Sequence, residues 1–236
     1  MPAALVTGSA TGIGREILLR LARDGYDVVV HYHSSEEEAA QVAALAREEG
    51  VQAHVLQCDI RDAAAAEQLV EDAHELTGDL AVLVNNVGNY HFGPLHELKL
   101  EEWREMLDSN LNSTFYTCQR AVPILRSRGG GRIVNIGYAG AEQIRARPNI
   151  APYVIAKTGV ILYSKALARE EAENGITVNV VSPGVMENSV TKPKSEIPAG
   201  RLGRLEELSA AVSYLVSEEA NYVTGITLEV AGGWNL

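Results

Sequence analysis

The stretch AALVTGSATGIG, from Ala3 to Gly14, joins a short apolar run to a glycine-rich turn. Ala3 to Val6 has the length and composition of a buried strand, and a helical pattern follows the turn. Gly8, Gly12 and Gly14 allow a tight turn, a close approach of the backbone to a ligand, and a helix packed against a strand. The start of the helix adds unpaired N–H groups and the positive end of a dipole, which bind a pyrophosphate. The stretch therefore predicts a dinucleotide site; a plain strand-to-helix connection is the alternative.

Strand-like and helical patterns alternate along the whole chain, with no linker, repeat or break in composition. Such alternation predicts βαβ units and a mostly parallel sheet. We expect strands at Ala3–Val6, Asp27–Tyr32, Val51–Cys58, Leu80–Val84, Gly131–Ile136, Ile176–Val181 and Ile226–Val230. We expect helices at Ile13–Asp24, Glu36–Gly50, Ala63–Leu76, Leu100–Leu125, Pro152–Asn174 and Leu205–Val216. Residues 1–236 are therefore predicted to form one α/β domain with a Rossmann fold, a doubly wound parallel seven-stranded sheet with helices on both faces.

The composition is that of a soluble globular protein, with 46% hydrophobic and 22% charged residues. A net charge of −11 argues against binding to nucleic acid or to an anionic membrane. No apolar run reaches the ~18 residues of a membrane helix, and the N-terminus lacks the basic segment of a signal peptide. The two cysteines, Cys58 and Cys118, fit a reducing cytoplasm. The histidines, including His31 and His33, lack the spacing of a metal site and are expected on the surface or in loops.

A tyrosine and a lysine, Tyr153 and Lys157, lie four residues apart in the expected helix over Pro152–Asn174. This spacing puts both side chains on one face, one turn apart. An ammonium beside a phenol favours the phenolate, so we expect it to lower the pKa of the tyrosine from ~10. Such a pair suits proton transfer to a carbonyl or from an alcohol. The pattern recurs by chance, so its meaning depends on the rest of the chain.

Further motifs follow the glycine turn in a fixed order. They are Thr7–Gly14, with the pattern T-G-x-x-x-G-x-G, then Cys58-Asp59-Ile60, Asn85-Asn86-Val87-Gly88, Asn110-Leu111, Tyr153-x-x-x-Lys157, Ser182-Pro183-Gly184 and Gly200–Arg204. In kind and in order these motifs resemble those of the short-chain dehydrogenases/reductases, and they cover nearly the whole chain. The sequence is most similar to the 3-oxoacyl-[acyl-carrier-protein] reductases of that family, notably in GITVNVVSPG and IPAGRLGR.

The resemblance implies a nicotinamide dinucleotide that lies across the carboxyl ends of the strands. The residues that it implies for the diphosphate turn are Gly8, Ser9, Thr11, Gly12, Ile13 and Gly14. It implies Asp59 and Ile60 at the adenine, Asn86, Val87 and Gly88 at the adenosine ribose, and Pro183, Gly184 and Val185 at the nicotinamide. Lys157 would also bind the hydroxyls of the nicotinamide ribose. The alternatives are a helix cap for Asp59 and a turn residue for Asn86.

The end of the second strand decides between the two nicotinamide cofactors. A carboxylate there pairs with the free ribose 2′-hydroxyl of NADH and repels the 2′-phosphate of NADPH. This chain has Tyr32, His33 and Ser34 instead, which carry hydrogen-bond donors and no acid. Against this, Thr11 stands where many NADPH-dependent relatives have arginine, and an acidic run begins at Glu36. We expect NADPH in preference to NADH.

The reaction implied by the resemblance is hydride transfer to a carbonyl carbon, with Tyr153 delivering the proton to the oxygen. Asn110 would bind a water that passes protons towards Lys157; a hydrogen bond inside its helix is a compatible second role. The substrate would be a small molecule or an acyl thioester. The similarity to the 3-oxoacyl-carrier-protein reductases further implies a place in fatty acid biosynthesis.

The chain departs from the family at its catalytic serine. The corresponding position holds Tyr138, and no serine lies between Ser127 and Ser164. A tyrosine can donate the same hydrogen bond, but its hydroxyl reaches further. The segment Tyr138–Glu142 also resembles the enoyl-carrier-protein reductases, which reduce a C=C bond but usually space their tyrosine and lysine by seven residues. Three functions stay open: a carbonyl reductase, an enoyl reductase that uses Tyr138, and a dinucleotide-binding protein without turnover.

Two loops are expected to shape the substrate side. Tyr90, His91 and Phe92 follow the asparagine motif and are expected to border the substrate. The loop Glu187–Ile197 is shorter than the substrate lid of the family, which predicts a more open pocket. Within it, Asn188 stands where the family usually has a threonine that contacts the carboxamide.

A basic cluster raises the question of a partner. It surrounds a Gly-Gly-Gly turn and consists of Arg120, Arg126, Arg128 and Arg132. The cluster is either a solvated helix end or a dock for an acidic partner such as acyl carrier protein, and we expect Arg128 and Arg132 near the mouth of the site. Asn174 stands where carrier-protein reductases can have arginine, which argues against that partner. The family implies a homodimer or homotetramer, with the tail Thr224–Leu236 in a second interface.

Overall fold

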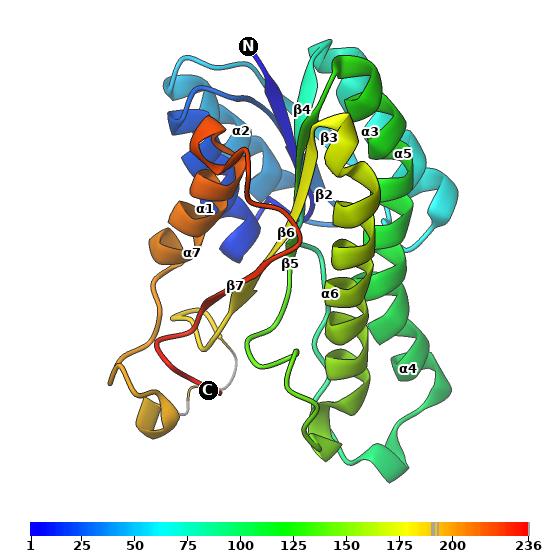
Figure 1. The fold of residues 1–236 in the computed structure, drawn as a ribbon, viewed down its shortest axis with the longest axis vertical. Helices are drawn as coiled ribbons and strands as arrows, with labels where there is room; N and C mark the ends of the chain where they lie inside the picture. The colour runs from blue at the N-terminus through cyan, green and yellow to red at the C-terminus, as the bar shows by residue number, and fades with distance from the viewer. Residues whose placement is uncertain (190–191, 193, 236) are drawn as a thin grey trace.

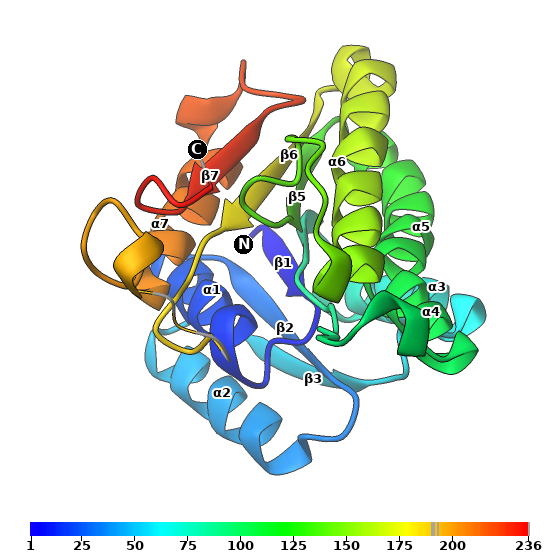
Figure 2. The same ribbon diagram turned by 90° about the horizontal axis from the view of Figure 1, so that it is seen from below.

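The computed structural model describes residues 1–189, 192 and 194–235. Its strands form one parallel seven-stranded sheet in the order β3-β2-β1-β4-β5-β6-β7 (Figure 2), which confirms the expected doubly wound sheet. The strands are β1 (Ala3–Val6), β2 (Asp27–Tyr32), β3 (Ala53–Gln57), β4 (Leu80–Asn85), β5 (Gly131–Ile136), β6 (Ile176–Pro183) and β7 (Thr227–Val230). Val190, Thr191 and Pro193 of the expected lid loop, and Leu236 of the expected interface tail, lie outside the described residues.

Helices cover both faces of the sheet (Figure 1). On one face lie α1 (Gly12–Arg23), α2 (Glu36–Glu48) and α7 (Leu205–Val216). On the other lie α3 (Ala63–Thr77), α4 (Leu100–Leu107), α5 (Ser113–Arg128) and α6 (Ala151–Glu171). Short 3-10 turns occur at Leu95–Glu97, Pro148–Ile150, Ala172–Asn174, Lys194–Glu196 and Glu218–Ala220. In the described part of the chain, no helix combines the length and the apolar character needed to cross a membrane.

The sheet is buried on both sides, which explains why its strands are continuous apolar runs. Every residue of β1 and of β4 is buried. In a parallel sheet with helices on both faces, both sides of each strand are buried, so consecutive residues are apolar. One core packs between the sheet and α1, α2 and α7, with Leu18, Leu21 and Leu208 fully buried in it. A second core packs under α3, α5 and α6, around Leu83 and Leu125.

The glycine turn between β1 and α1 is joined to the end of β4. Thr7 Oγ1 accepts hydrogen bonds from the N–H groups of Asn86 (2.9 Å) and Val87 (3.2 Å). Asn86 Nδ2 in turn donates to the carbonyls of Thr7 (3.0 Å) and Gly8 (3.2 Å). Gly8 and Gly12 have φ values of +62° and +57°, a left-handed conformation that favours glycine. Because the strand order reverses between β1 and β4, the turn lies at the crevice where such sheets bind ligands.

The prediction of one continuous helix over Leu100–Leu125 is wrong. A π-helical turn, Asp108–Asn112, separates α4 from α5. Hydroxyl side chains here donate to carbonyls four residues earlier, for example Ser109 Oγ to the carbonyl of Glu105 (2.6 Å). Such bonds compete with the regular backbone ladder. π turns occur frequently at functional sites, and this one has Asn110 at its centre.

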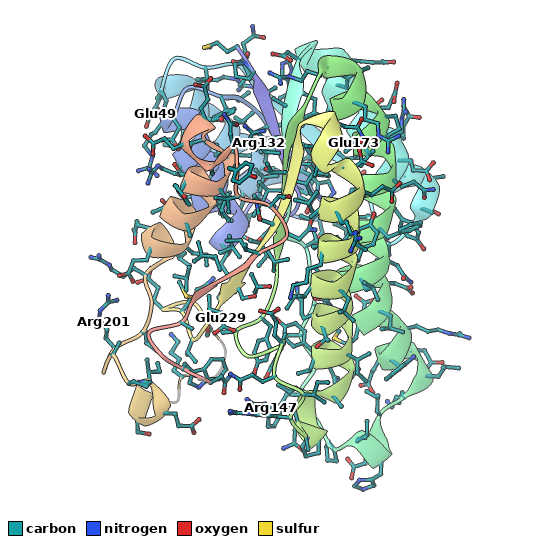
Figure 3. The ribbon with its side chains drawn as sticks, in the orientation of Figure 1. Glu49, Arg132, Arg147, Glu173, Arg201 and Glu229 are labelled. Carbon is teal, nitrogen blue, oxygen red and sulfur yellow. The ribbon has the colours of Figure 1, made fainter. Side chains whose placement is uncertain are left out.

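The basic cluster lies at the other end of the sheet from the carboxyl ends of its strands. Arg132 is the second residue of β5, and Figure 3 shows it at the opposite end of the molecule from Arg147. The expectation that Arg128 and Arg132 lie near the active-site mouth is therefore wrong. The cluster is also largely neutralised within the fold, by the ion pairs Arg120–Glu71, Arg126–Glu171 and Arg128–Asp79.

The packing of α1 on β1 predicts the effect of a single methyl group at Gly14. A Cβ there would lie 2.4 Å from the carbonyl oxygen of Gly8 and 2.5 Å from Nδ2 of Asn86. Because the backbone of Gly8 and the hydrogen-bonded side chain of Asn86 must both shift, we expect Gly14→Ala to lower the free energy of unfolding by about 2–3 kcal/mol, measured by urea denaturation.

Gly50→Ala is the matched control, because Gly50 has a φ of +85° but no atom within 4 Å of an added Cβ. Left-handed strain alone is expected to cost about 1 kcal/mol there. A loss in Gly14→Ala no greater than in Gly50→Ala would contradict the steric argument.

Candidate active site

Two adjoining cavities lie at the carboxyl ends of the strands, where a doubly wound sheet binds its ligand. The first has a volume of about 540 Å³. The predicted cofactor residues that line it are Gly8, Thr11, Gly12, Ile13, Tyr32, His33, Ser34, Asp59, Ile60, Asn86, Val87 and Gly88. The structure therefore brings together residues from the ends of four strands that are far apart in the sequence.

The second cavity, of about 580 Å³, shares Ile13, Gly88 and Asn188 with the first. The other predicted site residues on its wall are Tyr138, Tyr153, Pro183, Gly184 and Val185. Tyr90 and Phe92 also line it, as expected for residues that border a substrate, whereas His91 does not. The nicotinamide motif and the tyrosine pair therefore face one space.

Two residues of the glycine turn are not on a cavity wall. Ser9 is fully buried, and its Oγ accepts from the N–H of His31 (3.1 Å) while its own N–H donates to the carbonyl of His31 (2.9 Å). Both groups are thus used inside the fold, and the contact of Ser9 with a diphosphate stays a prediction. Gly14 is buried against the carbonyl of Gly8, so its role is the close packing of α1 on β1.

His31 is buried and hydrogen-bonds to the glycine turn from inside the fold. The expectation that it lies on the surface or in a loop is wrong. The side chain is 1% exposed, and its Nδ1 accepts from the N–H of Gly8 (3.0 Å). Its Nε2 lies 3.3 Å from the carbonyl oxygen of Cys58 and 3.4 Å from the Cys58 sulfur. An imidazole that accepts at Nδ1 is neutral and carries its proton on Nε2. Burial, with a smaller contribution from His33, lowers the pKa of His31 to about 4, so the neutral form persists.

Asp59 stands at the wall of the first cavity with its carboxylate engaged by Arg61. The guanidinium donates to it at 2.6 Å and 2.9 Å, and the Arg61 backbone N–H donates at 3.0 Å. These bonds lower the pKa of Asp59 to about 2. Arg61 also donates to Glu105 (2.6 Å). The alternative role of helix cap belongs to Asp62, which accepts from the N–H of Ala65 (2.8 Å).

Tyr153 and Lys157 lie on one face of α6, but their electrostatics differ from expectation. The Lys157 ammonium lies 5.9 Å from the centre of the Tyr153 ring and donates to the carbonyl of Ile136 (2.7 Å). Burial lowers the pKa of Lys157 to about 8. Burial, with the neighbouring Tyr138 and Tyr90, raises the pKa of Tyr153 well above its usual 10. The expected lowering is wrong for the protein alone, because lost hydration dominates and the ammonium is directed at a carbonyl.

Asn110 is fixed by its amide nitrogen and leaves its oxygen free. Nδ2 donates to the carbonyls of Asn89 (3.0 Å) and Met106 (3.0 Å), while Oδ1 is buried without a partner among the described residues. A Cβ added to Gly88 would meet that oxygen at 2.3 Å and Lys157 Nζ at 3.1 Å. The glycine thus leaves a small space that a buried acceptor and a buried donor both face. Asn110 and Lys157 are 0% and 4% exposed, so neither lines a cavity wall.

A buried polar network holds α6 against the centre of the sheet. Asn85 Nδ2 donates to Asn135 Oδ1 (2.9 Å), and Asn135 Nδ2 donates to Ser164 Oγ on α6 (2.8 Å). Thr117 on α5 donates to Asn85 Oδ1 (2.7 Å). A satisfied network of this kind rigidifies the core that contains it. The helix that carries Tyr153 is therefore tied to both β4 and β5.

Tyr138, at the position of the family's serine, is part of an aromatic chain. Its ring packs edge-to-face on Tyr153 (centres 5.4 Å apart) and on Trp234 (5.7 Å). Burial raises the pKa of Tyr138, and the charge of Arg147 opposes that rise. Ser182 does not supply the missing hydroxyl at the cavity, because it is 0% exposed and absent from both cavity walls.

Sequence reasoning missed several residues on the wall of the second cavity, among them Arg147 and Trp234. Arg147 comes from the loop between β5 and α6, and Trp234 comes from the segment after β7. Neither residue belongs to a motif. The only signal in the sequence was a charged or aromatic side chain outside the regular helices and strands. Asn188, noted at the usual threonine position, lines both cavities.

The neutral state of His31 predicts how stability depends on pH. The unfolded chain takes up a proton near pH 6.5 and the folded chain only near pH 4, so acid favours unfolding between these values. We expect His31→Phe to be less stable than wild type at pH 7, because the N–H of Gly8 loses its acceptor. The difference in the free energy of unfolding between wild type and His31→Phe should narrow by about 2 kcal/mol between pH 7 and pH 5, measured by urea denaturation.

His96→Phe is the control, since the His96 side chain is 81% exposed. It should track wild type at both pH values. A gap between wild type and His31→Phe that stays constant from pH 7 to pH 5 would rule out a neutral, buried His31.

Comparison with known proteins identifies the family to which this chain belongs. A family model described as enoyl-(acyl carrier protein) reductase matches residues 8–235. The 3-oxoacyl-[acyl-carrier-protein] reductase FabG of Staphylococcus aureus (strain Mu50) is 37% identical over 240 residues, which cover 98% of this chain and 96% of that protein.

Two solved structures show the same fold. The blue fluorescent protein from a metagenomic library, in complex with NADPH, superposes with a TM-score of 0.94 at 32% identity, over 100% of this chain and 98% of that chain. A double mutant of a Serratia marcescens short-chain dehydrogenase/reductase gives a TM-score of 0.94 at 34% identity, over 100% and 98%. The chain therefore belongs to the short-chain dehydrogenases/reductases, a family of NAD(P)-dependent oxidoreductases.

Proposed function

We propose that this enzyme uses NADPH to reduce the carbonyl group of a small molecule or acyl thioester to an alcohol. One observation carries the proposal: Tyr153 lines the same cavity as Pro183, Gly184 and Val185, while Lys157 lies buried beside it. A proton donor and the expected nicotinamide site thus share one space. The similarity to 3-oxoacyl-carrier-protein reductases supports a carbonyl as the group reduced.

The first cavity fits a dinucleotide. Thr11, at the N-cap of α1, makes no side-chain hydrogen bond to the helix start. The first-turn N–H groups beside Gly12 and Ile13 therefore suit a diphosphate. Lys157 would reach the nicotinamide ribose. When bound, NADPH supplies the hydride.

The titration behaviour of the pair suits reduction. Tyr153, with its pKa above 10, is protonated at neutral pH and can donate to the carbonyl oxygen as the hydride arrives. Lys157, with its pKa near 8, stabilises the resulting phenolate and exchanges a proton near neutral pH. The free Oδ1 of Asn110 would bind the water that carries protons onward from Lys157.

An enoyl reductase is the second candidate. The matching family model carries that description, and Tyr138 stands on the cavity wall beside Tyr153. Reduction of a carbonyl is favoured, because Tyr153 and Lys157 keep the four-residue spacing. Acyl carrier protein finds little support as a partner, since the basic cluster is ion-paired and lies at the far end of the sheet.

Removal of the phenol tests the proton donor. Tyr153→Phe should lower kcat for NADPH-dependent reduction of acetoacetyl thioester by about 10²–10⁴-fold, since a general acid contributes that much. Its NADPH affinity, measured by fluorescence titration, should stay within about twofold, a change of only ~0.4 kcal/mol. Tyr222→Phe, on a fully exposed tyrosine, is the control and should be as active as wild type.

The same assay separates the candidates. NADPH oxidation with crotonyl thioester and none with acetoacetyl thioester would replace the carbonyl reductase with the enoyl reductase. Tyr153→Phe with undiminished activity would remove Tyr153 as the proton donor.

The choice of cofactor is tested at Ser34, an exposed residue on the wall of the first cavity. Ser34→Asp places a carboxylate where the 2′-phosphate of NADPH would lie. Repulsion of about 1–2 kcal/mol should raise the KM for NADPH about tenfold or more, with little change for NADH. Ser34→Asn, uncharged and of the same shape, should affect both cofactors alike. Equal effects of the aspartate on NADPH and NADH would mean that no 2′-phosphate binds here.

A further inference from the structure

Arg147 is the only charged side chain on the described wall of the second cavity. No carboxylate lines that wall, although the whole chain carries a net charge of −11. The arginine belongs to the loop that precedes α6, and Figure 3 shows it at the end of the molecule where β7 leads into the C-terminal segment. The cavity of the proton donor is therefore locally positive within an acidic protein.

Arg147 is positioned without being neutralised. Its Nη2 donates to Asn235 Oδ1 (2.8 Å), and Asn235 Nδ2 donates to the carbonyl of Ala139 (3.1 Å). Glu229 on β7 accepts from the N–H of Gly140 (2.7 Å). Within residues 1–189, 192 and 194–235, Arg147 forms no ion pair, so its remaining N–H donors stay available to a ligand. A guanidinium held in this way suits the planar oxygens of a carboxylate.

The rest of the second cavity is aromatic and apolar. Tyr90 packs edge-to-face on Tyr153 (ring centres 5.2 Å apart), and the contacts of Tyr138 extend this chain to Trp234. Ile150 and Met186 also line the wall. Flat faces and edges of this kind bind flat, unsaturated groups, and they offer few partners to a polar body.

The order of the side chains along the cavity indicates where the two ends of a ligand would bind. Tyr138 lies between the proton donor Tyr153 and Trp234, and Arg147 is hydrogen-bonded to Asn235, the residue that follows Trp234. A carbonyl at Tyr153 therefore leaves the far side of the Tyr138 ring, towards Arg147, for a second group. The cavity of about 580 Å³ also includes the nicotinamide residues, so the space that remains suits a compact ligand.

We propose that the substrate is a compact carbonyl compound with a flat, unsaturated body and a carboxylate, and that Arg147 binds this carboxylate. The inference rests on the proposed carbonyl reduction and narrows its substrate class. Arg147 is then a specificity-determining residue, held by Asn235 in the C-terminal segment. The cavity would select a free acid over the corresponding neutral ester.

The test compares 4-acetylbenzoate with its methyl ester, using wild type, Arg147→Gln and Arg147→Lys. Wild type should reduce the acid with the higher kcat/KM. Arg147→Gln should lower kcat/KM for the acid at least tenfold, mainly through KM, and change the ester less than twofold. Arg147→Lys should recover part of the loss, because it keeps the charge but not the fork of donors. Arg145→Gln, an exposed arginine off the cavity wall, is the matched control and should change neither substrate.

A binding measurement keeps this inference apart from the proposed reaction. 4-Ethylbenzoate, which has no carbonyl to reduce, should quench the fluorescence of Trp234 in a Trp103→Phe background, and Arg147→Gln should weaken its binding about tenfold. If the ester is reduced in a Tyr153-dependent way but the acid is not preferred, the inference fails and the proposed reaction stands. If neither compound is reduced while 4-ethylbenzoate binds through Arg147, the proposed reaction fails and the carboxylate site stands. If 4-ethylbenzoate binds wild type and Arg147→Gln equally, the site is refuted.

Discussion

The hydrogen bonds that hold the turn between β1 and α1 are the constraint on which the rest of the site depends. The glycines of this turn have no side chains with which to pack, so hydrogen bonds from neighbouring segments fix its shape. His31 of β2 accepts the N–H of Gly8 from below, and Thr7 is tied to the residues that follow β4. These bonds require β1 to lie between β2 and β4, which is the strand order observed. The strand order and the shape of the first cavity therefore depend on the same hydrogen bonds.

The same sheet provides a rigid support for the residues proposed to transfer protons. Asn85, Asn135 and Ser164 connect β4, β5 and α6 through buried hydrogen bonds, and Lys157 is held at the carbonyl of Ile136. Taking an ammonium and a phenol out of water disfavours the charged form of each. The lysine is therefore easier to deprotonate and Tyr153 harder. A neutral phenol beside a lysine that titrates near neutrality is the arrangement that reduction of a carbonyl needs.

The residues proposed for chemistry and those proposed for selectivity come from different parts of the chain. Tyr153 lies on a long helix packed against the sheet, whereas Arg147, Trp234 and Asn188 come from loops and from the C-terminal segment. Catalytic geometry benefits from a rigid element, and binding residues are commonly carried on loops that a rigid scaffold positions. Tyr138 joins the two parts, because its ring contacts both Tyr153 and Trp234.

The sequence by itself determined the alternation of strands and helices, the parallel sheet and the glycine turn, because these depend on local patterns. The bounds of β1, β2, β5 and α7 agree with expectation, since each is an apolar segment with clear ends. Periodicity could not show the π turn at Asp108–Asn112, because hydroxyl-to-carbonyl bonds leave no mark on apolar spacing.

Tertiary structure alone decided which polar groups are buried. In a strand covered on both faces, alternation does not distinguish an inward His31 from a surface histidine. The pKa of Tyr153 follows the same rule, since its direction depends on how much water the fold removes and not on the spacing to Lys157. The meeting of Arg147 with Asn235 likewise requires segments distant in the chain. Local sequence encodes conformation, whereas burial and long-range contact arise only when the whole chain packs.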